Sequence, residues 1–222
     1  MPSKPSRTIG GRRAEYAAAT RQAIHDAARE LFVTKGYFAT TVDDIATAAR
    51  VAPASVYAVA GGKQGLLNSI IEARTTAPDV EETYARITGH DDATALLRFM
   101  IHATRVRFEN ARDLMRVVID TAPHEPAAAQ ALRSAHASLR TGLHLTAQRL
   151  ADLNALRDGV DVESATDTLW FYLSNGAYFT LTDDNHWSLD KAEEWLLESL
   201  RTAVLRPPTQ QGESPESSVV LQ

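Results

Sequence analysis

The stretch TVDDIATAARVAPASVYAVAGGK, residues 41–63, decides the fold of this chain. Four apolar residues of its first half recur with the period of one helix face: Val42, Ile45, Ala46 and Ala49. Thr41 is a good N-terminal cap, and Pro53 suits the first position of a second helix because no N–H partner is needed there. The spacing predicts two short helices joined by a tight turn at Arg50. This arrangement is typical of a helix-turn-helix that enters a DNA major groove, although any pair of antiparallel helices shares it.

The flanking sequence favours the DNA-binding interpretation. Residues 20–35 form an amphipathic pattern with one apolar face: Ile24, Ala27, Ala28, Leu31 and Phe32. Gly36 follows as a helix stop, and Gly61-Gly62 separates the hairpin from another apolar helix that starts at Lys63. A helix ahead of the hairpin supplies a core that two short helices cannot make alone. The sequence therefore predicts a three-helix DNA-binding domain over residues 20–75.

Residues 20–71 resemble the N-terminal domain of the TetR family of bacterial transcriptional regulators. The resemblance is carried by four spaced motifs: Ala27-Ala28-xx-Leu31-Phe32-xxx-Gly36-Tyr37, Thr40-Thr41-Val42-xx-Ile45-Ala46, Val51-xxx-Ser55-Val56-Tyr57 and Lys63-xx-Leu66-Leu67. It implies an all-α fold in which this domain precedes a larger helical domain for effector binding and dimerisation. Arg50 departs from the family, which usually has glycine at this position, so the turn must either suit arginine or accept strain.

The resemblance also implies which residues contact double-stranded operator DNA. Thr41, Tyr57 and Lys63 would bind phosphates. The residues that would face base edges are Ala52, Pro53, Ala54, Ser55 and Ala58. Ser55 is the polar member of that set, so base recognition would draw on Ser55, on alanine contacts to thymine methyl groups, on Asp43 or Asp44, and on the N-terminal arm.

Charge is distributed unevenly along the chain. The formal net charge is −5, yet residues 1–75 hold ten Lys and Arg against six Asp and Glu, a balance of +4. Residues 1–19 are expected to form a flexible basic arm that carries four cations: Lys4, Arg7, Arg12 and Arg13. The arm is either a solvated terminus or a segment that enters a minor groove beside the recognition helix.

Residues 76–206 read as helix throughout. Helices are expected over residues 93–112, 113–121, 126–153, 162–181 and 188–205, and residues 207–222 look disordered. The last two helices resemble the pair through which TetR-type proteins form homodimers, with aromatic residues at Trp170-Phe171-Tyr172, Trp187 and Trp195. A two-fold dimer is also what a palindromic operator requires.

The middle helices of the family enclose a pocket for a small effector. Five residues embedded in or near apolar stretches are candidates for lining it: His102, Met115, Trp170, Phe171 and Asn175. The alternative for each of them is an ordinary role in core or interface packing. A largely apolar effector is expected, and the protein is expected to be a repressor that this effector releases from DNA.

Other classes of function find less support. The chain has no cysteine, which fits a cytoplasmic, nucleoid-associated protein, and it has no apolar run long enough to span a membrane. It shows no phosphate loop, no nucleophile motif and no HExxH spacing, so no enzyme activity and no cofactor are expected. Two alternatives stay open: a DNA-binding protein without an effector, and a small helical enzyme with a metal at His90-Asp91-Asp92 or Asp183-Asp184-Asn185-His186.

Overall fold

A computed structural model describes residues 9–76 and 78–207. The N-terminal part contains α1 (Ile9–Thr34), α2 (Val42–Ala49), α3 (Pro53–Ala60) and α4 (Lys63–Thr75). The larger part contains α5 (Pro78–Ile87), α6 (Ala93–Thr121), α7 (Pro126–Asp152), α8 (Val162–Leu173), α9 (Asn175–Phe179), the π-helix η1 (Thr180–Asp184) and α10 (Leu189–Val204). The all-α fold is confirmed, and the one β-type contact of the described residues is an isolated bridge between Leu156 and Leu205.

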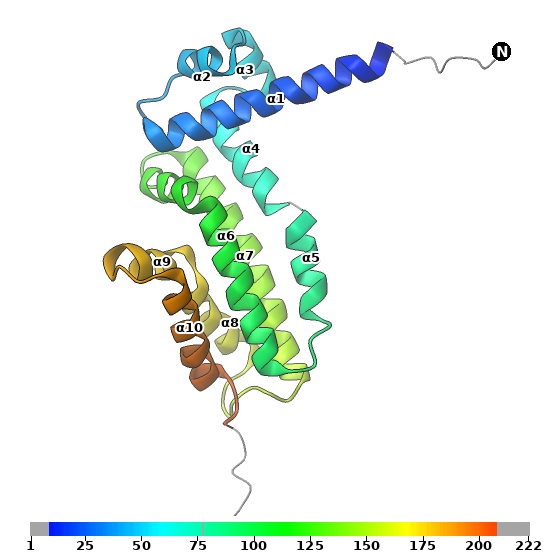
Figure 1. Ribbon diagram of the computed structural model, residues 1–222, viewed down its shortest axis with the longest axis vertical. Coiled ribbons are helices and arrows are strands. Elements are labelled where there is room, and N and C mark those ends of the chain that lie inside the picture. Colours follow the sequence, from blue (N-terminus) through cyan, green and yellow to red (C-terminus); the bar gives the residue numbers. More distant parts are fainter. Residues whose placement is uncertain (1–8, 77, 208–222) are drawn as a thin grey trace, which may run out of the picture.

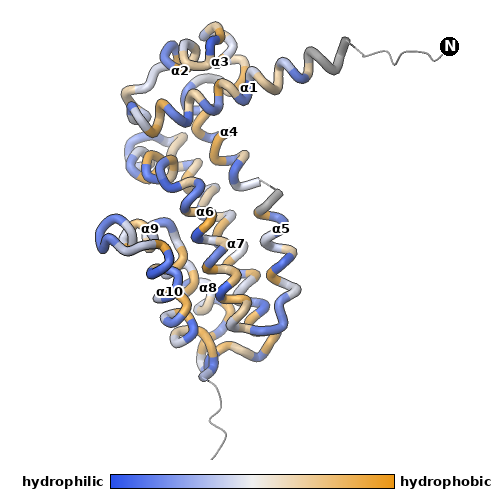
Figure 2. Tube along the Cα trace, in the orientation of Figure 1, coloured by the Kyte–Doolittle hydropathy of each residue, from blue (hydrophilic) through white to orange (hydrophobic). Residues whose placement is uncertain are grey.

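The molecule is elongated, with α1, α2 and α3 at one end (Figure 1). The long helices α6 and α7 run along the other part, α5 flanks them on one side, and α8 and α10 lie on the other. Apolar and polar residues alternate along α6 and α7 (Figure 2), as expected of helices that bury one face. No helix among the described residues is long and apolar enough to cross a membrane.

A small apolar core holds the N-terminal domain together. Seven of its side chains are fully buried: Ile24, Ala28, Phe32, Ile45, Val56, Leu66 and Leu67. The predicted face of α2 is confirmed at Ile45 and Ala46, and Gly36 ends the first helix region with φ of 87°. The four helices therefore share one core, which fixes the orientation of α3 relative to the other three helices.

Three predicted helix boundaries are wrong. First, α1 begins at Ile9 and not at Thr20, because residues 14–19 are rich in alanine, the best helix former. Arg12 and Arg13 therefore belong to a helix and not to a flexible arm, whereas residues 1–8 lie outside the described residues, as do 208–222 of the predicted tail.

Second, α6 is continuous from Ala93 to Thr121, where a break at residue 112 was expected. Third, the helix expected over residues 162–181 stops at Leu173. Ser174 is extended (φ −70°, ψ 159°), and the chain resumes as α9 and the π-helix η1. The sequence Ser174-Asn175-Gly176 consists of weak helix formers, which explains where the break occurs.

Candidate nucleic-acid interface and ligand pocket

The start of α2 is fixed by a reciprocal cap. The Thr41 hydroxyl accepts a hydrogen bond from the Asp44 N–H at 3.1 Å, and the Asp44 carboxylate accepts one from the Thr41 N–H at 2.8 Å. Lys35 Nζ also lies 2.6 Å from Asp44 Oδ2. Hydrogen bonds from Lys35 and Thr41 hold the pKa of Asp44 well below its usual range. Asp44 thus serves to cap the helix, which leaves the exposed Asp43 as the carboxylate of this turn that faces solvent.

The turn between α2 and α3 bends through a left-handed residue. Arg50 has φ of 57° and ψ of 44°. Its N–H donates to the Thr47 carbonyl at 3.2 Å, and the next N–H, of Val51, donates to the Ala46 carbonyl at 2.9 Å. These bonds satisfy the last carbonyls of α2. Arginine therefore occupies the backbone conformation that glycine adopts without steric cost.

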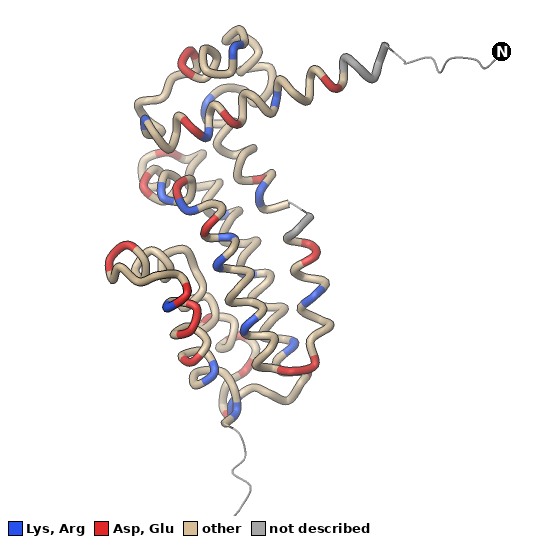
Figure 3. The backbone as a smooth tube through the Cα atoms, in the orientation of Figure 1, with Lys and Arg blue, Asp and Glu red and all other residues tan. Residues whose placement is uncertain are grey.

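Apart from Tyr57, the outer face of α3 consists of small side chains. Val56 is fully buried and anchors the helix, whereas Tyr57 is 57% exposed and Ser55 half-buried. The four remaining residues proposed to face base edges are all exposed: Ala52, Pro53, Ala54 and Ala58. Helix α3 carries no charged residue, whereas its neighbours do (Figure 3). The part of the helix that carries these small side chains can approach a partner surface closely.

Two contacts position the residues expected to touch phosphates. Gly62 has φ of 103°, and a Cβ there would lie 3.1 Å from Tyr57 Cε1, so glycine lets the Tyr57 ring cover the turn between α3 and α4. Lys63, the first residue of α4, donates from Nζ to the Tyr37 carbonyl at 3.0 Å and lies 4.4 Å from the centre of the Tyr37 ring. An ammonium group has three donors, so this contact leaves donors for a phosphate.

Arg12 and Arg13 lie in the first turns of α1, and their side chains are outside the described part of the structure. Helix α1 extends away from α2 and α3 at that end (Figure 1). Whether this segment touches DNA stays a prediction.

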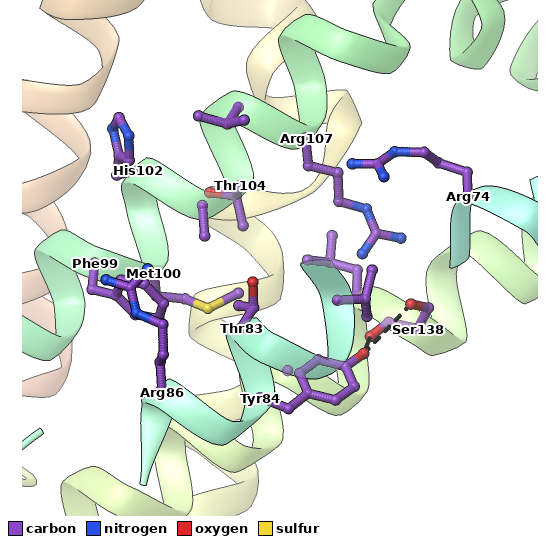
Figure 4. Close-up of a pocket in the computed structure, with 15 residues that line it drawn as sticks. Arg74, Thr83, Tyr84, Arg86, Phe99, Met100, His102, Thr104, Arg107 and Ser138 are labelled. Carbon is purple, nitrogen blue, oxygen red and sulfur yellow. Dashed lines mark hydrogen bonds between the residues drawn. The ribbon is translucent and has the colours of Figure 1, made fainter. Parts of the chain in front are cut away.

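A cavity of about 210 Å³ lies among α4, α5, α6 and α7 (Figure 4). Its lining combines apolar and basic side chains: Arg74, Val80, Thr83, Tyr84, Arg86, Phe99, Met100, His102, Ala103, Thr104, Val106, Arg107, Ser138, Leu139 and Gly142. The Tyr84 hydroxyl donates to the Ser138 carbonyl. A Cβ on Gly142 would lie 3.0 Å from Tyr84 Cε1, so glycine makes room for the tyrosine ring against α7.

The five residues proposed to line an effector pocket do not form one site. His102 lines the cavity, and its Nδ1 lies 3.3 Å from the Glu193 carboxylate. The other four lie elsewhere: Met115 is buried in α6, Trp170 packs edge-on against His136, Phe171 is 72% exposed and Asn175 begins α9. Sequence reasoning missed the cavity residues of α4, α5 and α7, because they come together only when these helices pack.

An exposed aromatic cluster joins α8 and α10. Phe171 lies edge-on to Tyr172 with ring centres 5.3 Å apart, Tyr172 lies 5.8 Å from Trp195, and Trp195 lies 5.7 Å from Trp187. Phe171 is 72% and Trp195 42% exposed. We call these four residues the aromatic face. Exposed apolar groups of this size are typical of protein interfaces.

The acidic segments considered as metal sites are engaged in other contacts. Asp91 pairs with Arg149 at 3.0 Å, Asp92 caps α6 through the Ala95 N–H at 2.6 Å, and Asp183 pairs with Arg112 and Arg116. Among the residues that the structure describes, no cluster of three potential ligands could hold a metal ion.

Comparisons with known proteins agree with this geometry. The family model of the bacterial regulatory proteins of the tetR family matches residues 24–70, which span the core of the N-terminal domain. No curated protein matches the sequence. Because the family model was matched on the residues that the four sequence motifs occupy, the resemblance inferred from the sequence is confirmed.

Three solved structures share the fold over most of the chain. SmeT of Stenotrophomonas maltophilia in its triclosan complex is 22% identical, with a TM-score of 0.69 over 89% of this chain and 100% of SmeT. NalD, the secondary repressor of the MexAB-OprM multidrug efflux pump in Pseudomonas aeruginosa, is 24% identical, with a TM-score of 0.68 over 86% and 98%. The transcriptional regulator FadR from Bacillus subtilis in complex with stearoyl-CoA is 20% identical, with a TM-score of 0.66 over 81% and 96%.

Proposed function

We propose that this chain, whose residues 24–70 match the family model of the tetR regulatory proteins, is a TetR-type repressor that a small ligand releases from DNA. It binds a palindromic operator as a homodimer, with one α3 in each of two successive major grooves. A small molecule in the cavity then favours a spacing of the two N-terminal domains that does not fit DNA. The solved complexes of SmeT with triclosan and of FadR with stearoyl-CoA support a role for ligands in this fold.

The observation that carries this proposal is the course of α4. Its first residue, Lys63, contacts Tyr37 of the DNA-binding domain, and Arg74 in its last turn lines the cavity. A helix of 13 residues is about 20 Å long. One rigid element thus joins the cavity to the DNA-binding domain, and a ligand that changes its tilt changes the position of α3.

The dimer is proposed to form through the aromatic face. An interface of that kind would bury Phe171, whose exposure is costly in a monomer. A Phe171→Asp variant should sediment as a monomer and lose operator affinity, whereas Phe38→Asp, which also replaces an exposed aromatic residue, should stay dimeric. Monomers in the unmodified protein would refute this part of the proposal.

The first experiment is selection of bound sites from random duplex DNA with the purified protein. An enriched palindrome supports the repressor, and Ser55→Ala should change the preference at one base position. Lys63→Ala should weaken binding to all sequences and make the salt dependence shallower by about one unit per subunit, because a phosphate contact is lost. Arg206→Ala is the matched control, because Arg206 follows the end of α10 and pairs with Asp158.

A DNA-binding protein without an effector is the second candidate. Selection of a motif alone does not distinguish the two, because both bind DNA. If no cavity ligand changes operator affinity, the site-blocking function replaces the ligand-released repressor. If only weak, salt-sensitive binding without a motif is recovered, both fail.

A further inference from the structure

The Tyr37 side chain ends in a buried hydroxyl group without a hydrogen-bond partner. Tyr37 is 2% exposed, and no described residue forms a hydrogen bond with its hydroxyl oxygen. The ring itself is packed on both neighbours in the domain, with ring centres 5.2 Å from Phe32 and 5.6 Å from Phe38. Removing a polar group from water without giving it a partner is costly, and few buried groups in proteins stay unpaired. This hydroxyl therefore calls for a functional explanation.

A carboxylate that can accept the hydroxyl proton lies at the start of α7. Burial, and after it the negative charge of Glu125, raise the pKa of Tyr37 to about 12. The hydroxyl is thus protonated at neutral pH, and Glu125 is close enough for its charge to act on Tyr37. Glu125 already contacts the DNA-binding domain, since Gln64 Nε2 donates to Glu125 Oε1 at 3.0 Å. A carboxylate offers about four acceptor sites, so it can accept from Tyr37 as well.

Tyr37 and Gln64 are the two neighbours of Lys63, the residue expected to bind a phosphate. Lys63 Nζ donates to the Tyr37 carbonyl at 3.0 Å and lies 4.4 Å from the centre of the Tyr37 ring. Gln64 follows Lys63 in α4 and is bonded to Glu125. The surroundings of Lys63 are therefore connected to α7 by one formed hydrogen bond. A shift of the domain against α7 that brings the Tyr37 hydroxyl onto Glu125 adds a second connection.

We propose that the Tyr37 hydroxyl is unpaired in the DNA-free protein and donates to the Glu125 carboxylate when the protein binds its operator, which fixes the position of Lys63. We call this pair the Tyr37–Glu125 latch. The inference rests on the operator-binding part of the proposed function and does not depend on an effector. The two N-terminal domains of a dimer must lie at one separation to reach successive major grooves, so a bond that holds each domain on α7 is favoured in the bound state. Tyr37 and Glu125 are positioning residues that act through Lys63.

The central variant is Tyr37→Phe, which removes only the hydroxyl group. The DNA-free protein has no bond to lose, so its free energy of unfolding in urea should stay unchanged or rise. Affinity for the selected operator, measured by fluorescence anisotropy, should fall about tenfold, because the bound state loses a hydrogen bond to a charged acceptor.

Tyr178→Phe is the matched control, because Tyr178 is equally buried at 1% exposed but has a paired hydroxyl. That hydroxyl lies 3.0 Å from the Thr104 hydroxyl and 3.2 Å from the Ile101 carbonyl. Tyr178→Phe should therefore show the opposite pattern: a lower free energy of unfolding and an operator affinity close to that of the unmodified protein.

A double-mutant cycle assigns the effect to Glu125. Glu125→Gln keeps an acceptor oxygen for Gln64 and for the Ala127 N–H but removes the charge. Operator affinity should fall in this variant as well. Addition of Tyr37→Phe to Glu125→Gln should then lower the affinity by less than about threefold, because the partner of the hydroxyl is already weakened.

Full operator affinity in Tyr37→Phe overturns the inference, as do additive effects in the cycle. A loss of stability in Tyr37→Phe as large as that in Tyr178→Phe also overturns it, because the hydroxyl would then be paired in the DNA-free protein. These three results leave the repressor function intact. Operator binding that depends on the latch but that no small molecule changes refutes the ligand-released repressor and leaves the latch intact. Failure to bind any duplex refutes both.

Discussion

Replacement of Arg50 by glycine should make the protein more stable. Arg50 is exposed and adopts φ of 57° and ψ of 44°, a conformation that crowds the Cβ atom against the backbone. A residue with a Cβ loses about 1–2 kcal/mol there relative to glycine. Glycine also gives the unfolded chain more freedom, which offsets about 0.4–1 kcal/mol of the gain. The expected net increase in the free energy of unfolding is therefore about 0.5–1 kcal/mol.

Thermal unfolding followed by circular dichroism measures this change. For a chain of this length, 1 kcal/mol corresponds to about 2–4 °C, so Arg50→Gly should raise Tm by about 1–4 °C. Arg50→Ala is the matched control: it removes the guanidinium but keeps the Cβ, so its Tm should stay close to that of the unmodified protein. A gain of equal size in Arg50→Ala, or no gain in Arg50→Gly, would refute the assignment of strain to the backbone.

Three further outcomes are expected. Thr41→Ala removes the acceptor for the Asp44 N–H and should lower the free energy of unfolding by about 1 kcal/mol in urea denaturation, whereas Thr41→Ser should retain most of it. The folded-state pKa of Asp44 lies below its ordinary value of 3.8, so the pair with Lys35 stabilises the protein above pH 3.8. This contribution is lost as the pH falls below that value. The free energy of unfolding of Asp44→Asn should therefore depend less on pH in the acid range. A Cβ on Gly65 would lie 1.6 Å from the Ala60 carbonyl oxygen. Gly65→Ala should therefore lower the free energy of unfolding by about 3 kcal/mol or more and abolish operator binding in a mobility-shift assay. Binding of normal affinity would contradict the close approach of α3 and α4.

The DNA-binding hairpin could be predicted because its signals are local. Thr41 does cap α2, and Pro53 does stand at the first position of α3. Even the departure at Arg50 was informative, since a position where relatives have glycine implies a left-handed residue, and the structure has one there. Helix caps, turn residues and a short apolar period each depend on residues that are close in sequence. They can therefore be recognised before the rest of the fold is known.

The break after α8 could be predicted only in part. Weak helix formers mark its place, but its geometry depends on a distant helix. The Tyr178 hydroxyl lies 3.0 Å from the Thr104 hydroxyl and 3.2 Å from the Ile101 carbonyl of α6, and the Tyr178 ring stacks on Phe108 at 5.0 Å. These contacts with α6 favour a displaced segment over a continuous helix. The cavity was missed for the same reason, because its walls come from four helices that are separate in sequence.

The way in which α3 is attached to α4 explains how a small cavity can influence DNA binding. The Ala60 carbonyl at the end of α3 packs so closely on Gly65 that no side chain fits between the two helices. Helix α3 must therefore follow any change in the tilt of α4. Polar contacts also link the domain to the larger part, such as Arg29 Nη2 to the Asn110 carbonyl at 2.8 Å and Gln64 to Glu125 at 3.0 Å. A ligand that changes the tilt of α4 needs to contribute only about 1–3 kcal/mol of coupling to change operator affinity 5- to 150-fold.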